Sequence, residues 1–492
     1  MTPSSSSSSS QLSTFLQWLS SNNVHIDPRI QIVHTPKTGY TVQALSDIPY
    51  GVRVSKTPKS AVLSVRNCTL SDTLWPFLKP LEPNIALSIA LLSEQLLGRD
   101  SRFWGYLQSL PEEADIALFW KLKGQDGEEA LLWLQNTEVS AILRTSLLAD
   151  LDRTYTQVVR PALAQWSPTI DRFRKAYSLV SSRAFQVDSW HGVGLVPVAD
   201  AFNHSEENGV FMETDFAVCT QCGSLGPCAH PEHTPPHSSP WDEPMTCDMV
   251  TYAPLKAGEE VFNSYDEKGL GNAKLLVWYG FLLEGNGEDR IGFEREVEGV
   301  LRVGGGEGEG EGEWSGKRWE EVRDVAAGFG EELEELEAVV TPSEWVEVGE
   351  EEDETEPGSS WIDAEGRVSL ALFLLLFARN STEERDIATH LHLVISVMKL
   401  LDQPGEKETV LAGIPSAVLK TLKGVAKDVQ RLCASKMENM YRPELTTSDL
   451  AAMLDTHLGP RTKLAVSYVV TERLMLETCS KRWQDLAESL NE

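Results

Sequence analysis

The sequence has no hydrophobic run long enough to cross a membrane and no recognisable signal peptide. Its longest uninterrupted apolar stretch runs only from Leu370 to Ala378, far short of the roughly 20 residues that a membrane-spanning helix needs. The first residues carry neither a basic region nor an apolar core. The serine run from Ser4 to Ser10 favours a disordered tail over residues 1–11. We therefore expect no membrane partner and a nuclear or cytoplasmic protein.

Cysteine is too scarce and too unevenly spaced for a disulfide framework. The chain has 7 cysteines among 492 residues, whereas small secreted proteins use an even and dense set. This scarcity favours a reducing, intracellular compartment. The length is too great for one hydrophobic core and predicts two or three domains. We expect a monomer.

Basic residues are also few: the chain has 43 Lys and Arg but 74 Asp and Glu, which gives a net charge of −31. This sign disfavours direct binding of nucleic acid. The excess is local, because 26 acidic and 6 basic residues lie between Glu284 and Glu356. The acidic segments 304–313 and 350–358 cannot bury enough apolar surface to fold alone. Two interpretations stay open: flexible, solvated acidic loops, or an electrostatic attractor for a basic protein substrate.

What the sequence does contain is a change from short strands to helices along the chain. Strand-like runs separated by turn residues occur from Val33 to Val65 and return at 194–198 and 249–265. A helical apolar repeat occupies roughly residues 80–180 between them. After about residue 290, helical spacing dominates, at 370–379, 388–401, 417–433, 447–454 and 463–490. The pattern predicts an α+β domain over 12–290, split by a helical insert, and a helical domain over 291–492.

Two segments some sixty residues apart mix strand-like runs with polar residues that buried strands do not carry. The first comprises Ser181–Phe185 and Leu195–His204. The second comprises Gly258–Tyr265, Asn272–Leu276 and Tyr279–Phe281. Together they resemble the SET-domain protein methyltransferases, in the branch of Rubisco large-subunit methyltransferase and the ribosomal-protein lysine methyltransferases. The resemblance implies small β-sheets with a pseudoknot, a helical insert, and an all-α C-terminal domain like the Rubisco-substrate-binding domain.

The same resemblance implies S-adenosylmethionine-dependent methylation of a lysine in a non-histone protein, such as a ribosomal or other intracellular protein. This chemistry is an in-line displacement that is accelerated mainly by positioning. The amine must be neutral although the pKa of free lysine is about 10.4, and an apolar channel lined by tyrosines suits that demand. Two alternatives stay open: methylation of histidine, and a silent SET module that binds a protein without modifying it.

The resemblance also implies roles for individual residues around the lysine channel. Tyr265 takes the position of the catalytic tyrosine and also borders the cofactor. The other residues implied at the channel are Ser182, Phe185, Asp200 and Tyr279. Arg183 braces the channel beside the cofactor, or acts only as a structural ion-pair partner.

Cofactor binding is implied for two further segments. Asn203 offers an amide to the amino-acid end of S-adenosylmethionine, and His204 can orient the strand or donate a hydrogen bond on the adenine side. Near the N-terminus, Thr38, Gly39 and Tyr40 take the place of the family's Gly-x-Gly loop, whose second glycine is Thr41 here.

A cysteine- and histidine-rich insert at about 215–247 lies between the two signatures. Cys219-x2-Cys222-x5-Cys228-x-His230 offers the ligand types that zinc prefers, and Cys247 follows nearby. The pattern predicts a structural zinc ion held by Cys219, Cys222, Cys228 and either His230 or Cys247. The alternative is a thiol-bearing loop without metal.

Overall fold

The computed structural model describes residues 5–35, 39–231, 245–266, 269–293, 360–381, 387–402 and 414–490. The chain divides into two compact units. The first unit comprises Met1–Phe119, Thr145–Leu270 and Leu275–Phe281. The second comprises Trp120–Arg144, Gly271–Lys274 and Leu282–Glu492. Both acidic segments, 304–313 and 350–358, lie outside the described residues. None of the described helices is long and apolar enough to span a bilayer.

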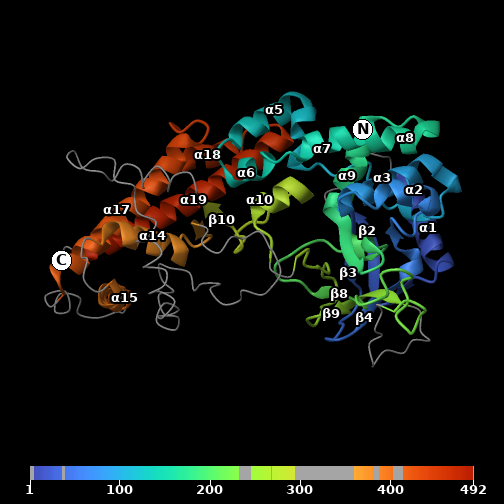
Figure 1. Ribbon diagram of the computed structural model, residues 1–492, viewed down its shortest axis with the longest axis horizontal. Coiled ribbons are helices and arrows are strands. Elements are labelled where there is room, and N and C mark those ends of the chain that lie inside the picture. Colours follow the sequence, from blue (N-terminus) through green and yellow to red (C-terminus); the bar gives the residue numbers. More distant parts are fainter. Residues whose placement is uncertain are drawn as a thin grey trace. The chain divides into compact units, whose positions relative to one another are not determined.

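The first unit is built on small antiparallel sheets (Figure 1). A four-stranded sheet has the order β1 (His25–Ile26), β4 (Arg53–Pro58), β9 (Thr246–Thr251) and β8 (Val210–Thr214). A three-stranded sheet has the order β5 (Leu63–Ser64), β7 (Gly192–Leu195) and β6 (Ala184–Asp188), and β2 (Ile30–Thr35) pairs with β3 (Gly39–Ala44). These small sheets and the surrounding helices confirm the α+β class.

The segment Phe262–Asn263 is held on both edges by a loop that precedes it by sixty residues. The Phe262 carbonyl accepts hydrogen bonds from the N–H groups of Gly209 and Val210, at 2.8 and 3.1 Å. On the other edge, the Asn263 N–H donates to the Asn203 carbonyl at 2.8 Å, and the Asn263 carbonyl accepts from the Ser205 N–H at 3.1 Å. The C=O of one planar peptide and its N–H point in opposite directions, so the segment passes between two parts of the loop. This is the pseudoknot that the resemblance implied.

Two helices of the first unit, α3 (Pro83–Leu97) and α9 (Ile170–Arg183), pack on one another, and α9 leads directly into β6. α3 starts at Glu82, whose carboxylate accepts the N–H groups of Asn84 and Ile85. It is buried on nearly every side from Ile85 to Glu94. Because α9 ends at Arg183 and β6 begins at the next residue, the helix end fixes where Arg183 and Phe185 lie.

Further helices of the first unit are α1 (Ser5–Ser21), α2 (Ser71–Leu78), α4 (Trp104–Leu107), α7 (Leu147–Thr154) and α8 (Arg160–Ala162). The start of α1 corrects the expectation of a disordered tail over residues 1–11, since the helix begins at Ser5. Its second half buries Phe15 and Leu19. Once packing has nucleated a helix, serines extend it at modest cost.

The second unit is mainly helical. Its helices are α5 (Gly124–Trp133), α6 (Glu138–Leu143), α10 (Asn272–Lys274), α14 (Leu370–Asn380), α15 (Ile387–Asp402), α17 (Ser416–Asn439), α18 (Thr447–Met453) and α19 (Pro460–Ser489). The five helices expected after residue 290 are confirmed, although α17 runs to Asn439. α17 lies along α19 (Figure 1). The unit is not all-α as expected, because β10 (Arg290–Gly292) pairs with β11 (Trp361–Asp363).

The structure moves the boundary between the two units. It lies at Phe281 instead of about residue 290, and residues 120–144 of the expected insert join the second unit. Residues 120–144 join the second unit because α5 packs against α19, and a polar contact fixes the start of α19. The Asp126 carboxylate on α5 accepts the N–H of Thr462 at 3.1 Å and its hydroxyl at 2.9 Å. An aspartate that satisfies free N–H groups in a first helical turn stabilises that turn.

A buried carboxyl group lies in the core of the second unit. Glu472 on α19 is 2% exposed and accepts the Tyr468 hydroxyl at 2.7 Å and the Glu138 N–H at 2.8 Å. The Glu138 carboxylate pairs with Lys436 at 2.9 Å. Burial, reinforced by the charge of Glu138, raises the pKa of Glu472 to about 8. Glu472 therefore holds its proton more tightly in the folded protein than in the unfolded chain.

We expect stability to fall as pH rises from about 4.5 to about 8, because the folded state keeps a Glu472 proton that the unfolded state releases. Glu472→Gln mimics the protonated carboxyl, so the variant should gain melting temperature relative to wild type as the pH is raised through this interval. Melting curves across that range measure the difference. The matched control is Glu488→Gln, an exposed position on the same helix. An equal pH dependence for wild type and Glu472→Gln would contradict the buried proton.

Candidate active site

Four rings cluster beside the threaded segment of the first unit. Tyr265 stacks on His204 with centroids 5.0 Å apart and on Tyr279 at 4.9 Å, with interplanar angles of 25° and 26°. Phe281 meets the Tyr265 ring edge-on at 6.5 Å. Three of these rings were named from the sequence, and the structure brings them together. Stacked rings of this kind form a flat apolar wall with hydroxyl groups at its rim.

Gly280 sets the positions of Tyr279 and Phe281 on either side of it. It has φ +81°, and a Cβ there would lie 2.5 Å from the Asp115 carbonyl oxygen. Its N–H donates to the Leu275 carbonyl at 2.8 Å and closes a short π-helical turn over Leu275–Tyr279. Only glycine satisfies both the positive φ and this close approach. The turn also receives the Ser181 hydroxyl of α9, which donates to the Trp278 carbonyl at 3.1 Å.

His204 is held as a neutral ring. Its Nδ1 accepts the backbone N–H of Tyr265 at 3.1 Å, so the proton of the neutral imidazole is assigned to Nε2. Burial lowers the pKa of His204, which keeps the ring neutral at physiological pH. Within the described residues, the buried Nε2 has no hydrogen-bond partner. A buried donor without a partner is uncommon in proteins and suits a polar ligand.

The two tyrosines cannot act as bases near neutral pH. Burial raises the pKa of Tyr265 to about 12 and that of Tyr279 to about 12. The Tyr265 hydroxyl donates to the Phe202 carbonyl at 3.4 Å, a long bond that leaves the oxygen able to accept another donor. Both phenols therefore remain neutral groups that can orient a ligand.

Asp200 is fixed by a residue that the sequence reasoning did not assign to the site. The hydroxyl of Tyr106, on α4, donates to Asp200 Oδ2 at 2.6 Å. Arg183 Nη1 donates to the backbone carbonyl of Asp200 at 2.9 Å. Burial raises the pKa of Asp200 although Arg183 and Tyr106 act against this rise. No local sequence pattern pointed to Tyr106, and only the fold shows that α4 faces Asp200.

The backbone just before Asp200 is strained. Val198 has φ 75° and ψ −48°, close to a classic γ-turn, which is rare for any residue other than glycine. For a β-branched residue this conformation costs on the order of 1–3 kcal/mol. It persists because the surrounding segment is pinned: Val198 is fully buried, and the Asp200 N–H donates to the Val196 carbonyl at 3.1 Å.

Asn203 belongs to a second polar network, centred on Glu260. The Asn203 side-chain amide donates to Glu260 Oε1 at 2.7 Å, and the Thr41 hydroxyl donates to the same oxygen. Sequence reasoning did not assign Glu260, although Gly258-Glu259-Glu260 opened the second signature. The network also gives Thr41 a role: where the family has a second glycine, this chain has a hydroxyl that holds Glu260.

The remaining residues named from the sequence are placed less directly. Ser182 donates its hydroxyl to the Ser178 carbonyl of its own helix at 2.9 Å. Phe185 lies on β6 opposite Gly194. Gly39, with φ +75°, opens β3, and the Tyr40 ring packs edge-on against His34 at 5.1 Å. Thr38 lies outside the described residues.

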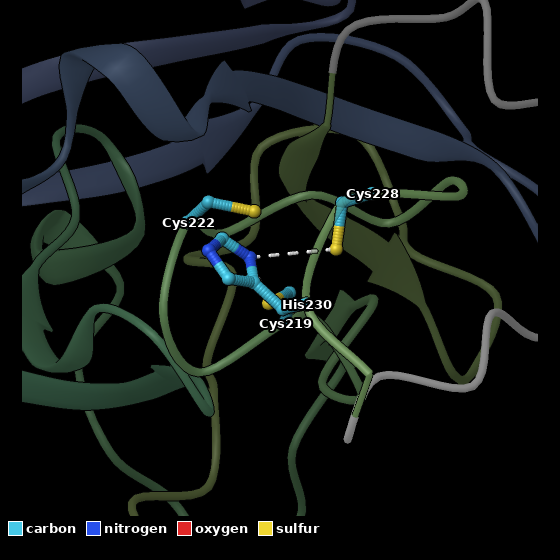
Figure 2. Close-up of side chains that lie close together, drawn as sticks. All are labelled: Cys219, Cys222, Cys228 and His230. Atoms are coloured by element: carbon cyan, nitrogen blue, oxygen red, sulfur yellow. Dashed lines mark hydrogen bonds between the residues drawn. The ribbon is translucent and has the colours of Figure 1, made fainter.

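Four residues of the Cys/His-rich insert form a separate cluster in the first unit. The ligand atoms of Cys219, Cys222, Cys228 and His230 all lie within 4.8 Å of one another (Figure 2). Burial raises the pKa of the Cys219 thiol, but hydrogen bonds from the N–H groups of Cys222 and Gln221 outweigh this effect. The pKa is lowered to about 6.

Cys247 is not part of this cluster, so the structure decides between the two proposed fourth ligands. Cys247 lies within β9, paired with Thr57 and Thr214, and its thiol donates to the Thr214 hydroxyl at 3.9 Å. Burial raises the pKa of this thiol to about 11. The expectation that Cys247 could replace His230 is wrong, because strand pairing holds it elsewhere.

The fold resembles that of SET-domain proteins. Solved structures of Rubisco LSMT resemble the whole chain: the form bound to AdoMet has a TM-score of 0.57 at 17% identity, and the SET domain bound to MeLysine and AdoHcy has 0.58 at 16%. In both cases 98% of this chain and 93% of the other are covered. At such identities the likeness concerns the fold.

Several curated proteins are similar to this chain in sequence, although no family model matches it. Ribosomal lysine N-methyltransferase 3 of Saccharomyces cerevisiae is 24% identical over 352 residues, 56% of this chain and 62% of that protein. The Rubisco large-subunit N-methyltransferase of Nicotiana tabacum is 24% identical over 289 residues, 58% and 54%. N-lysine methyltransferase setd6 of Xenopus laevis is 25% identical over 293 residues, 54% and 56%. The chain thus matches little more than half the length of these relatives, and the resemblance to SET-domain lysine methyltransferases is confirmed.

Proposed function

We propose that the protein is an S-adenosylmethionine-dependent protein-lysine N-methyltransferase. The observation that carries the proposal is the stack of His204, Tyr265 and Tyr279 against the threaded Phe262–Asn263 segment. It places neutral phenols and an unpaired buried imidazole donor beside one another. A methyl-transfer site must desolvate an amine and orient it without a strong base, and neutral phenols suit that task.

The residues present fit the cofactor. His204 Nε2 and Arg183 Nε are buried and have no hydrogen-bond partner in the described part of the chain. Donors of this kind suit the heteroatoms of a nucleoside or a carboxylate. Asn203 keeps its side-chain carbonyl oxygen for the ligand because its amide is engaged by Glu260. We therefore assign the cofactor to Asn203, His204 and the adjoining Gly39–Tyr40 backbone.

The mechanism rests on positioning. When bound, S-adenosylmethionine would supply an electrophilic methyl group for transfer to a neutral lysine amine. Tyr265 and Tyr279 contact the stem of the lysine and orient its nitrogen through hydroxyls that stay protonated. Asp200 is held in place by the Tyr106 hydroxyl and would border the lysine channel. Burial disfavours a charged amine and so favours the nucleophilic form.

The substrate is assigned only by class. The names of the yeast and tobacco relatives specify a ribosomal protein and the Rubisco large subunit as their substrates. We propose a lysine in a protein for this chain as well. The acidic stretch between Glu284 and Glu356 favours a basic substrate surface by charge complementarity.

The test is transfer of a labelled methyl group from S-adenosylmethionine to proteins of a cell extract. We expect labelled methyl-lysine after mass spectrometry of the acceptor band. Labelled methyl-histidine instead of methyl-lysine would show that histidine is the target residue. Saturable binding of the cofactor without transfer to any protein would favour a silent binding module and overturn the enzymatic proposal.

A further inference from the structure

We propose that Cys219, Cys222, Cys228 and His230 bind one structural zinc ion, with His230 ligating through Nδ1. All four come from a segment of twelve residues in the first unit, and their side chains face one another around a common centre (Figure 2). Three sulfurs and one imidazole nitrogen are a ligand set of closed, four-coordinate zinc sites. Thiolates also select zinc over magnesium or calcium, which prefer oxygen.

The distances suit a tetrahedral ion. His230 Nδ1 lies 3.3 Å from Cys219 Sγ and 3.6 Å from Cys228 Sγ. A tetrahedral zinc ion with Zn–S near 2.3 Å and Zn–N near 2.0 Å separates sulfur from nitrogen by about 3.6 Å and two sulfurs by about 3.8 Å. The limit of 4.8 Å on every pair of ligand atoms leaves only small rotations to complete the geometry.

The backbone of the loop is already folded around the cysteines. The Gly223 N–H donates to the Cys219 carbonyl at 2.7 Å, and the Cys219 N–H donates to the Ser224 carbonyl at 2.9 Å. Gly223 adopts φ +72°, a conformation that favours glycine. This tight turn presents Cys219 and Cys222 to the same side. Val218 and Leu225 are buried, whereas Phe216 at the base of the loop is 49% exposed. A bound metal would add stability to this small apolar contact.

The contacts of the Cys219–His230 loop indicate which part of the fold the ion would stabilise. Gly223 packs on the Trp190 ring, and the Phe216 carbonyl accepts the N–H and the hydroxyl of Ser189 at 3.1 and 3.0 Å. Both contacts fall on the turn between β6 and β7. This turn follows Asp188, the last residue of β6, which forms a buried ion pair with Lys59 at 2.8 Å. Zinc would therefore hold the insert against the β6–β7 turn, and this role does not depend on the proposed methyl transfer.

Metal content of the full-length protein, purified under reducing conditions without a chelator and without a histidine tag, tests the proposal. We expect about one zinc per chain by elemental analysis, and almost none in Cys222→Ser or His230→Ala. The matched control is Cys247→Ser, which should keep the ion. Cobalt added to metal-free protein should give the visible absorption of tetrahedral thiolate-bound cobalt, and this absorption should be lost in His230→Ala.

A second measurement separates loss of metal from loss of fold. Chelation of wild-type protein should lower its melting temperature, and added zinc should restore it, while chelator should leave the metal-free Cys222→Ser variant unchanged. Protein without zinc, protein containing iron or copper in its place, or a disulfide among the three cysteines under reducing conditions would each overturn the proposal. Zinc retained at full occupancy by His230→Ala would overturn the assignment of the fourth ligand.

Discussion

Replacing Tyr265 by phenylalanine is expected to reduce turnover by on the order of 100-fold, as loss of one preorganised hydrogen-bonding group in an active site does. The phenyl ring keeps the stacks on His204 and Tyr279, which lie 5.0 and 4.9 Å away. The substitution therefore removes only the hydroxyl, whose contact with the Phe202 carbonyl is a long 3.4 Å. Cofactor affinity should change little, because the effect is confined to the transition state.

The measurement is turnover at saturating cofactor, paired with the dissociation constant of the cofactor from calorimetry. Tyr252→Phe makes the same chemical change at a tyrosine that is 58% exposed in the same unit, and it should leave both quantities unaltered. If Tyr265→Phe also left turnover unaltered, the hydroxyl would have no part in the reaction. A large loss of cofactor affinity with normal turnover would instead make Tyr265 a binding residue.

Asn203→Ala is expected to weaken cofactor binding by about tenfold or more, which corresponds to about 1.4 kcal/mol. The alanine removes the side-chain carbonyl that would meet the ligand and the amide that donates to Glu260 at 2.7 Å. The Glu260 carboxylate would then keep the Thr41 hydroxyl but lose this amide donor. Loss of a buried polar partner typically costs about 1–3 kcal/mol.

Asn67→Ala is the matched control for this variant. Its side-chain amide donates to the carbonyls of Lys59 and Val62 in the same unit, at 2.8 and 3.1 Å, so the substitution should lower stability and leave affinity alone. Melting temperatures for both variants separate the two effects. Wild-type affinity for Asn203→Ala, in protein of normal stability, would place the cofactor elsewhere.

The Glu260→Gln variant tests whether cofactor affinity depends on the whole polar network or only on the Asn203 side chain. Glutamine keeps one acceptor oxygen where the carboxylate of Glu260 takes donors from both Asn203 and Thr41. We expect a smaller loss of cofactor affinity than for Asn203→Ala, since Asn203 itself remains. An equal or larger loss would mean that Glu260 contributes directly to the cofactor site.

The sequence by itself determined the features that are local in the chain. Strand and helix periodicity predicted the α+β class and the helices of the second unit, because burial on one face of an element leaves a repeating apolar pattern. The two signatures led to His204, Tyr265 and Tyr279, which the structure brings into one cluster of rings, and to Asn203, which lies in the polar network of Glu260. Cys219, Cys222 and Cys228 could likewise be grouped from the sequence, because they lie close together in one short loop.

Only the tertiary structure decided the contacts between distant segments. Tyr106 meets Asp200 across 94 positions of the chain, and Thr41 meets Glu260 across 219, and no periodicity encodes such pairs. His230 rather than Cys247 completes the cysteine cluster, because pairing of β9 with its neighbours holds Cys247 apart. The local sequence pattern determines which side of a helix or strand is buried. Threading and the order of the strands determine which side chains of distant segments come into contact.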